Sequence, residues 1–334
     1  MPYLREQGIQ CDFEYMISPE DDKTFYAPGH LFQKGMIFLK CWIKRFQDTA
    51  KAKDYDIVFI QREAFITGST YFEKRFKKSG AKNVFDFDDS IWLSNISEAN
   101  KLFAFLKDAS KTSKLIEMTD LVIAGNEYLA SYARQFNKNV VIIPTTIDTE
   151  EYKPEKGLRD PNKITIGWSG SITTIQHFKF AIPFLEKIKE KYGDRVEIKV
   201  IGDGNYVNEK LGIQGIAWNK ERELLELNTF DIGIMPLPDD EWAKGKCGLK
   251  GLQYMALEIP TLMSPVGVNS DILQDGVNGF LAGPYSEWFE KTSKLIEDAD
   301  LRTIMGKAGR QTVIDHYSIE AQKGNYLKYL TRLF

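Results

Sequence analysis

Residues 231–256 read Asp-Ile-Gly-Ile-Met-Pro-Leu-Pro-Asp-Asp-Glu-Trp-Ala-Lys-Gly-Lys-Cys-Gly-Leu-Lys-Gly-Leu-Gln-Tyr-Met-Ala. An apolar run is followed by a polar loop and a glycine-bearing helix start, the order expected where a buried strand of a parallel sheet ends. Backbone N–H groups at such a helix start attract anions. Lys246 and Lys250, expected one helical turn apart, add charge suited to a diphosphate, and Gln253 is placed to reach a ribose hydroxyl. The other interpretation is a solvated lysine loop that caps a packing helix.

Two series of short apolar runs alternate with amphipathic segments, which is the pattern of parallel sheets covered by helices. The first series predicts strands at 9–16, 57–60, 84–87, 121–124 and 140–143, and helices at 31–50, 69–79, 96–108 and 126–136. The second predicts strands at 164–168, 196–201, 230–236 and 261–264, and helices at 174–192, 219–227, 247–257, 285–297 and 299–312. We therefore expect an α/β protein with two Rossmann-like, doubly wound domains that face a cleft.

A polar stretch with two prolines and a glycine, 148–163, separates the two series and is the expected linker. It divides an N-terminal domain, 1–147, from a C-terminal domain, 164–317. The last segment, 318–334, has apolar residues at helical spacing and is expected to pack back on the first domain. The chain opens at 1–8 with what reads like the end of a helix, so the first domain is expected to lack its opening strand. A misassigned start codon, a shortened chain and a smaller sheet all remain open.

The composition excludes several classes of protein. A chain of 334 residues with 43% hydrophobic and 27% charged residues is expected to form two folded, soluble domains. Its net charge of −3 is not that of a protein that binds duplex nucleic acid. Cys11, Cys41, Cys247 and the three histidines share no metal-binding spacing, so we expect no metal, no other cofactor and a reducing cytoplasm. No apolar segment is long enough to span a membrane, and the N-terminus lacks the order of a signal peptide.

Ser169, Gly170 and Ser171 follow the strand expected at 164–168. They therefore lie at the carboxyl edge, where open α/β sheets bind ligands, and Gly170 permits a close approach of the backbone. A tight turn into the next helix is the alternative interpretation.

These passages, together with Pro-Thr-Leu-Met-Ser-Pro-Val-Gly-Val-Asn-Ser-Asp-Ile-Leu-Gln-Asp-Gly-Val-Asn-Gly-Phe-Leu at 260–281, resemble the family-four (group 1) retaining glycosyltransferases of the GT-B superfamily. The resemblance covers nearly the whole chain. It implies that the turns at 169–171 and at Gly267 and Val268 face the donor phosphates, and that Gly202 and Trp218 cradle the nucleotide base. The family's Asp-Gly-x-x-Gly signature stands at 275–279. Trp218 as a filler of the core is equally open.

Three positions depart from the family pattern. Gln253 stands in place of the second glutamate of the motif, Gly245 in place of the first, and Glu258 where the helix usually ends in glycine. A subfamily with Gly-Lys-Cys-Gly in this loop, here 245–248, is similar to the chain. We interpret the change as a subfamily variant in which Lys246 and Lys250 supply charge to the diphosphate. Loss of activity is the competing explanation.

The resemblance implies a hexosyltransferase-type enzyme that moves a sugar from a nucleotide diphosphate sugar to a cell-envelope glycan or glycolipid, without a metal ion and with retention of configuration. The first domain would hold the acceptor and the second the nucleotide sugar. The residues expected to act in catalysis are Asp88, Asp89, Lys246 and Lys250, and those expected to bind the donor are Ser169, Gly170, Ser171, Gly202, Trp218, Lys246, Lys250, Gln253, Gly267 and Val268. A non-catalytic or shortened nucleotide-sugar-binding protein and a sugar-nucleotide epimerase are the rival hypotheses.

Carboxylates follow the first-domain strand expected at 84–87. Asp88 and Asp89 resemble the acidic motif of the subfamily and are expected to orient an acceptor hydroxyl. A helix or turn cap is the alternative. Arg62 and Glu63 occupy a similar edge after the strand at 57–60, with weaker support.

Basic and aromatic residues are mixed in two predicted helices of the first domain. Residues 31–53 contain six basic residues against one acidic residue, and Lys74, Arg75, Lys77 and Lys78 follow on the next helix. Basic amphipathic helices with aromatic side chains suit an anionic membrane surface. We therefore expect a cytoplasmic protein in peripheral contact with the inner face of the cell membrane, with a solvated face over a core stripe as the alternative.

Overall fold

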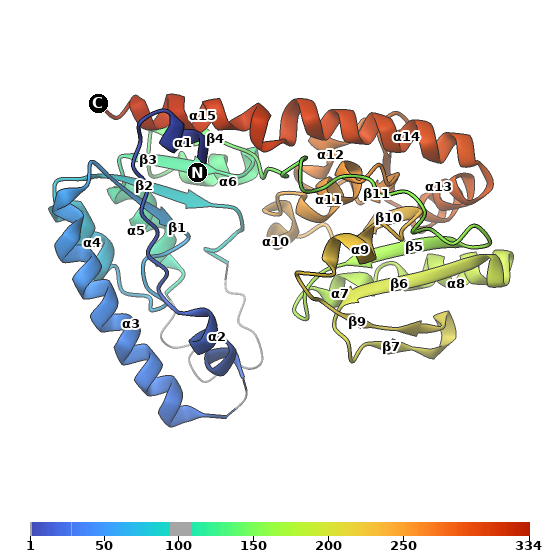
Figure 1. Cartoon of the computed structure of the whole chain (residues 1–334), viewed down its shortest axis with the longest axis horizontal. Helices are drawn as coiled ribbons and strands as arrows, with labels where there is room; N and C mark the ends of the chain where they lie inside the picture. Colours follow the sequence, from blue (N-terminus) through green and yellow to red (C-terminus); the bar gives the residue numbers. More distant parts are fainter. Residues whose placement is uncertain (1, 28, 94–107) are drawn as a thin grey trace. The chain divides into compact units, whose positions relative to one another are not determined.

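The computed structural model describes residues 2–27, 29–93 and 108–334, which form two compact units (Figure 1). The first unit comprises Met1–Ile143 and Asn325–Phe334, and the second comprises Pro144–Gly324. Each unit has a parallel sheet flanked by helices, so the predicted α/β class is confirmed.

The first unit contains a four-stranded parallel sheet in the order β1-β2-β3-β4. Each strand coincides with an apolar run in which strands are predicted. The strands are β1 (Ile57–Gln61), β2 (Lys82–Phe87), β3 (Leu121–Ala124) and β4 (Val140–Ile142). The helices are α1 (Pro2–Glu6), α2 (Pro19–Tyr26), α3 (Leu31–Lys51), α4 (Tyr71–Lys78), α5 (Ser110–Met118) and α6 (Glu127–Ala133).

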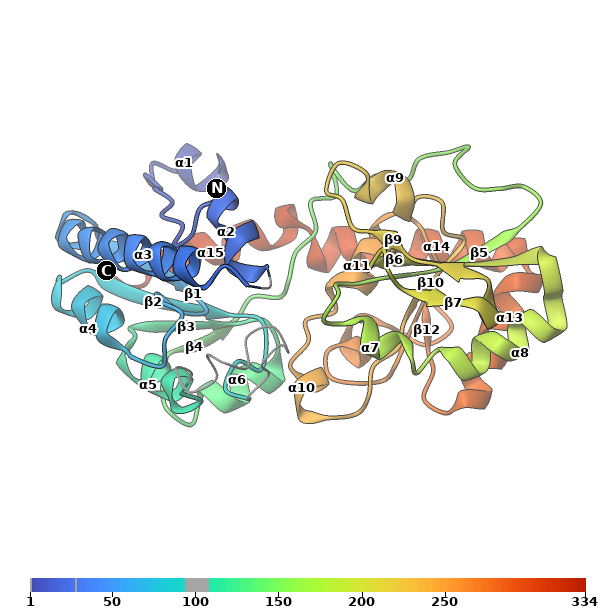
Figure 2. The same ribbon diagram turned by 90° about the horizontal axis from the view of Figure 1, so that it is seen from below.

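Both faces of this sheet are covered. Helices α4, α5 and α6 lie on one side, and the N-terminal segment and the end of α15 (Ile319–Thr331) lie on the other (Figure 2). Leu4 and Leu330 are buried there against Val84, Leu121 and Ile123. Segments from the two ends of the chain thus complete one apolar core.

The strand predicted at 9–16 is wrong, because this segment is assigned no strand. Side chains tie it to the rest of the unit instead. The Tyr55 hydroxyl donates to Asp12 at 2.8 Å, and Lys44 of α3 pairs with Glu14. Ile9 and Cys11 pack on the core of the unit, whereas Phe13 and Tyr15 are exposed, so only the first half of the alternating pattern reflects burial.

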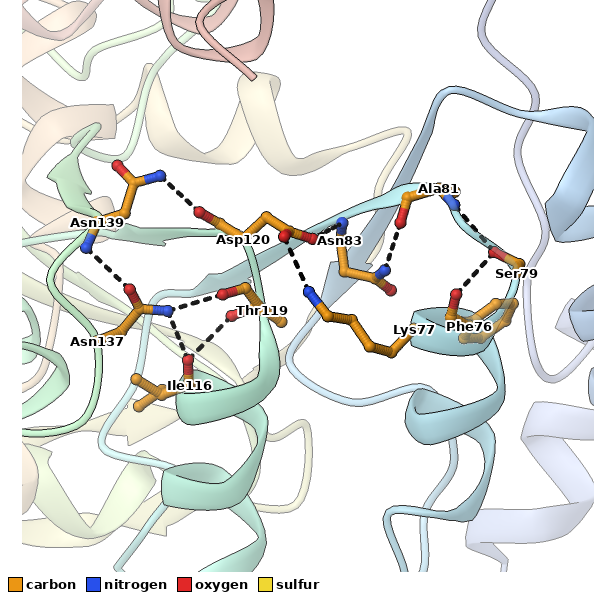
Figure 3. Close-up of polar contacts among 10 residues, drawn as sticks. All are labelled: Phe76, Lys77, Ser79, Ala81, Asn83, Ile116, Thr119, Asp120, Asn137 and Asn139. Atoms are coloured by element: carbon orange, nitrogen blue, oxygen red, sulfur yellow. Dashed lines mark hydrogen bonds and ion pairs between the residues drawn. The ribbon is translucent and has the colours of Figure 1, made fainter. Parts of the chain in front are cut away.

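A polar network joins the starts of β2 and β3 (Figure 3). The Asp120 carboxylate accepts hydrogen bonds from the backbone N–H of Asn83 and from Lys77 Nζ, both at 2.8 Å. The Asn137 amide donates to the carbonyl oxygen of Thr119 at 2.9 Å. These groups lie at the amino ends of the strands, opposite the edge at which open α/β sheets bind ligands. We therefore assign the network a structural role.

The second unit contains a six-stranded parallel sheet in the order β12-β11-β10-β5-β6-β9, with a small antiparallel pair, β7 and β8, beside it. The strands are β5 (Ile164–Ser169), β6 (Val196–Gly202), β7 (Val207–Asn208), β8 (Ile213–Gln214), β9 (Ile216–Ala217), β10 (Ile232–Met235), β11 (Thr261–Met263) and β12 (Phe280–Leu281). The helices that precede α15 are α7 (Ile175–Phe178), α8 (Ile182–Tyr192), α9 (Glu223–Leu227), α10 (Glu241–Lys244), α11 (Leu249–Ala256), α12 (Asn269–Ile272), α13 (Tyr285–Glu297) and α14 (Ala299–Thr312).

Helices also cover this sheet on both faces. Phe184 of α8 and Trp288 of α13 stack with ring centroids 5.1 Å apart in the core on one face. Leu252 and Met255 of α11 pack with Met263 of β11 in a second core. Neither face of the sheet is left to solvent over these strands.

Two segments of the second unit differ from expectation. The helix predicted at 174–192 is divided into α7 and α8, because Pro183 cannot donate the hydrogen bond that a continuous helix needs. The expected linker, 148–163, is bound to the second unit by hydrogen bonds. Arg310 of α14 donates to the carbonyl oxygens of Tyr152 and Thr149 at 2.7 and 3.2 Å. The helix predicted at 96–108 falls almost wholly outside the described residues.

Within the described residues, the helices are either too short or too polar to cross a lipid bilayer.

Candidate active site

Open α/β sheets bind ligands beyond the carboxyl ends of their strands, where the strand order reverses. In the second unit the order reverses at β5, which lies between its successor β6 and the later strand β10. Ser169 is the last residue of β5, and Gly170 and Ser171 begin the loop after it. Lys246 lies in the loop between α10 and α11, the two helices that follow β10. Both loops were predicted to contact the donor.

Glycines bring the loops after β5 and β6 together. Gly170 donates its backbone N–H to the carbonyl oxygen of Ile201 at 2.9 Å. A Cβ atom on Gly202 would lie 2.8 Å from the Gly170 carbonyl oxygen, and one on Gly170 would lie 2.2 Å from the Trp168 ring. A side chain at Gly202 would therefore separate the two strand ends, and one at Gly170 would collide with the Trp168 ring of its own strand.

The lysine loop, residues 245–248, connects α10 to α11. Since α11 begins at Leu249, Lys246 lies in the loop before the helix, and the expected spacing of one helical turn between Lys246 and Lys250 is wrong. The Lys246 ammonium lies 5.1 Å from the centroid of the Trp242 ring. Burial lowers the pKa of the nearby His177, and the charge of Lys246 lowers it further. The charge of Asp240 acts in the opposite direction.

The turn at Gly267 and Val268 packs on the entrance to the lysine loop. Gly267 has a φ of +54°, and a Cβ atom there would lie 2.6 Å from the Lys244 carbonyl oxygen. Both the backbone conformation and the space therefore require glycine.

Glu223 of α9 gathers several donor-side residues around its carboxylate. Its Oε1 accepts from Trp218 Nε1 at 3.1 Å and from Lys250 Nζ at 3.3 Å, and its Oε2 accepts from the Tyr152 hydroxyl at 3.1 Å. Burial acts to raise the pKa of Glu223, but the contacts with Trp218 and Lys250 outweigh it and hold the pKa below its ordinary value. The carboxylate is therefore charged at neutral pH and pairs with Lys250.

Gln253 is buried beside this carboxylate. Its Nε2 donates to the Tyr152 hydroxyl at 2.6 Å, whereas its Oε1 has no hydrogen-bond partner among the described residues. A buried oxygen without a donor carries an energetic cost that a ligand hydroxyl would remove.

Ser169 differs from the other predicted donor-binding residues. Its hydroxyl and its backbone N–H both contact the Tyr254 hydroxyl, at 2.9 and 2.6 Å, and its side chain is buried. The Ser169 side chain is therefore a packing contact, which leaves the exposed Ser171 to meet a ligand at this edge.

In the first unit, Asp88 and Asp89 lie beyond the end of β2 and contact Arg62, beyond the end of β1. Arg62 Nε donates to Asp88 at 2.9 Å, and its terminal nitrogen lies 2.5 Å from an Asp89 oxygen. Arg62 has a φ of +61°, which is uncommon for a residue with a side chain. Its backbone N–H is held by the carbonyl oxygen of Asp86 at 2.8 Å.

Asp86 adds a titratable group to this cluster. Burial raises its pKa to about 7, the charge of Asp88 adds to the effect, and Arg62 opposes it. Asp86 is therefore partly protonated near neutral pH.

Glu63, the other candidate at this edge, takes part in a buried ion cluster. Lys111 of α5 lies 3.0 Å from Glu63 and 3.2 Å from Glu73, and it also donates to the carbonyl oxygens of Phe65 and Thr67. Lys111 thus anchors the loop that follows β1.

The structure brings together three of the predicted donor-binding residues, Trp218, Lys250 and Gln253. Glu223 and Tyr152, which join them, were not predicted. A glutamate in a five-residue helix and a tyrosine in a polar stretch carry no periodic signal, and both contacts span long sequence separations. The described residues contain no cluster of three or more His, Cys, Asp or Glu side chains suited to a metal, and the expected absence of a cofactor stays a prediction.

Residues 163–298, which contain all the predicted donor-binding residues, match the family model described as glycosyl transferases group 1. No curated protein matches the chain. Sucrose-phosphate synthase from Thermosynechococcus elongatus has a similar structure, with 15% sequence identity over 89% of this chain and 79% of that one and a TM-score of 0.67. Anabaena HepE in complex with UDP and glucose shares 15% identity over 86% of this chain and 81% of its own, with a TM-score of 0.65.

TarM is a third similar structure, with 15% identity over 82% of this chain and a TM-score of 0.62. The chain covers 54% of TarM, about half its length. These likenesses show a shared architecture: the chain has the GT-B fold. Within its second unit, residues 163–298 match the model of the group 1 glycosyl transferases.

Proposed function

We propose that the chain is a glycosyltransferase that moves a hexose from a nucleotide diphosphate sugar to a glycan or glycolipid of the cell envelope. The observation that carries the proposal is the position of Trp218, Lys246, Lys250 and Gln253. Trp218 follows β9, Lys246 lies in the lysine loop, and Lys250 and Gln253 lie in α11. All four are within the region that matches the group 1 family model. A protein of this kind would work in the cytoplasm.

The donor chemistry follows from the charges at these positions. The lysine loop and the backbone N–H groups at the start of α11 attract a diphosphate. They would stabilise the leaving diphosphate in place of a metal ion. The unpartnered Oε1 of Gln253 would accept a hydrogen bond from a ribose hydroxyl. HepE is seen with UDP and with UDP-glucose, so a uridine donor is the first to test. Retention of configuration rests on the family resemblance.

The acceptor chemistry belongs to the first unit. Asp88 is half-exposed and Asp89 largely buried, and both contact Arg62. We propose that Asp88 orients the acceptor hydroxyl. Asp88→Asn should then lower transfer while sparing the affinity for the donor. A loss of donor affinity in this variant would contradict the assignment.

The test is thermal stabilisation of the purified protein by UDP, GDP, dTDP and CMP sugars, with release of the nucleotide followed in parallel. Selective stabilisation with acceptor-dependent release would support a transferase and name the base. Conversion of the sugar without an acceptor would indicate an epimerase. Stabilisation without turnover would favour a non-catalytic binding protein.

The ion pair between Lys250 and Glu223 allows a sharper test of the donor site. If Lys250 contacts the diphosphate, Lys250→Met should weaken donor binding by about tenfold to a hundredfold, since hydrogen bonds to charged groups contribute about 1.5–3 kcal/mol. The double variant Lys250→Met, Glu223→Gln removes both charges of the pair. If it regained full donor affinity, Lys250 would serve only to neutralise Glu223.

A further inference from the structure

Helix α3 has two apolar faces. The inner face is packed, since Ile37 and Cys41 are 7% and 5% exposed. One edge of the helix is packed as well: the Phe38 ring lies 5.1 Å from that of Phe65, and the Trp42 ring 6.0 Å from that of Phe72. These contacts fix the orientation of α3 on its own unit.

The outer face of α3 bears a second apolar stripe. The five residues of this stripe, named below, fall within about 80° of arc on a helix with 3.6 residues per turn. They lie opposite Ile37 and Cys41 and extend over a length of about 21 Å. They are between 38% and 83% exposed. The outer stripe consists of Phe32, Met36, Leu39, Ile43 and Phe46. Contiguous apolar patches of this kind on a folded protein mark interaction surfaces.

The charge of the chain is segregated toward this surface. Residues 31–53 carry six basic residues and one acidic residue, and α4 carries four basic residues and one acidic residue. These segments together carry a net charge of +8 in a chain of net charge −3, so the rest of the chain carries a net charge of −11. Two of the basic residues, Lys34 and Arg45, are buried. An anionic surface would therefore attract α3 and α4 and repel the remainder of the protein.

The lysines of this surface are available to an anionic partner. Lys40 and Lys44 on the flank of the outer stripe pair with Asp21 and Glu14, but the lysine side chains are 67% and 36% exposed. Ion pairs between exposed side chains contribute little, so phosphate groups would compete for these lysines. Lys53, Lys74 and Lys78 are exposed, and these three form no ion pair with the described residues.

We propose that the outer stripe of α3 inserts into the headgroup region of an anionic lipid bilayer, with the flanking lysines on the lipid phosphates. An amphipathic helix with a basic flank binds such an interface through its buried apolar area and its charge. A second copy of the chain would bring the same positive flank against itself. The inference deepens the proposed function, because a lipid-linked acceptor would be presented at that surface.

The test is sedimentation of the whole protein with vesicles of phosphatidylcholine, with and without phosphatidylglycerol. The vesicles contain neither donor nor acceptor. The wild-type protein should bind the anionic vesicles, and raised salt should weaken binding. Met36→Glu with Ile43→Glu should lower the partition coefficient at least about tenfold, because each inserted side chain contributes more than 1 kcal/mol.

Two controls keep the result specific. Met36→Leu with Ile43→Leu preserves the apolar stripe and should bind as the wild type does. Ile304→Glu changes a side chain of α14 that is 66% exposed and lies in the other unit, and it should also leave binding unchanged. All of these variants should keep their stabilisation by a nucleotide sugar, so a failure of the transferase assay does not affect the vesicle result.

Absence of binding by the wild-type protein, or equal binding by the double glutamate variant, would overturn the proposal. So would a dimer in solution that the double glutamate variant converts to a monomer, since the outer stripe would then be an interface between two copies.

Discussion

At the scale of single residues, the protonation of Asp86 makes the stability of the protein depend on pH. Burial and the charge of Asp88 raise its pKa to about 7, whereas an aspartate in an unfolded chain titrates near pH ~4. The folded protein therefore holds a proton that the unfolded chain releases between these values. The stabilisation is complete below pH ~4 and is lost as the pH rises through about 7.

Asp86→Asn should remove this dependence, because the amide stays neutral. Urea denaturation of both proteins at about pH 5 and about pH 8 checks this, with the wild type losing more stability than the variant. An equal loss in the variant would show that other groups cause the pH dependence.

Lys111 offers a second prediction at this scale. It neutralises Glu73, which is 1% exposed, so Lys111→Met would leave that carboxylate buried without a cation. The expected loss is about 3–5 kcal/mol in the free energy of unfolding. Lys114→Met is the matched control on the same helix, because its pair with Asp108 is exposed and should contribute little to stability. Similar losses in the two variants would contradict the assigned role of Lys111.

At the scale of elements, the sequence predicts long segments with a regular spacing of apolar residues. It does not predict short elements whose position depends on contacts with distant parts of the chain. Helices α13 and α14 have the predicted bounds, and Asp298, which caps the start of α14, separates them. The two-residue strands β9 and β12 show no period at all. The residues of the proposed donor site could be predicted because polar residues follow apolar runs. The contacts of Glu223 with Tyr152 and Lys250 could not, because they depend on the packing of three separate segments.

The turn at Gly267 gives a prediction about an element. Alanine at a positive φ costs about 1–2 kcal/mol, and at Gly267 a Cβ atom would also press on the backbone of Lys244, directly before the lysine loop. Gly267→Ala should therefore reduce both stability and donor affinity. Gly276→Ala is the control, because its φ is +79° but the nearest atom to the added Cβ lies 3.9 Å away. It should cost stability alone, as measured by denaturation and by nucleotide titration. Unchanged donor affinity in Gly267→Ala would show that the lysine loop adapts.

At the scale of the whole molecule, the two units have separate cores although one helix belongs to both. Helix α15 starts in the second unit and ends in the first, where Leu330 is 7% exposed against Leu4 and Leu121. A truncation of Leu330 would therefore act on the core of the first unit, whereas a nucleotide sugar would bind the second.

Calorimetry of the whole chain should then show two transitions. Leu330→Ala should lower the transition temperature of the first unit only. The expected loss in the free energy of unfolding is about 2–5 kcal/mol, because a leucine in a packed core leaves a cavity when shortened. A nucleotide sugar should raise only the transition of the second unit, because a ligand stabilises the fold that binds it. If both changes moved one shared transition, the units would unfold together, and the continuity of α15 would be the physical reason, since melting its end in the first unit would then release its start in the second.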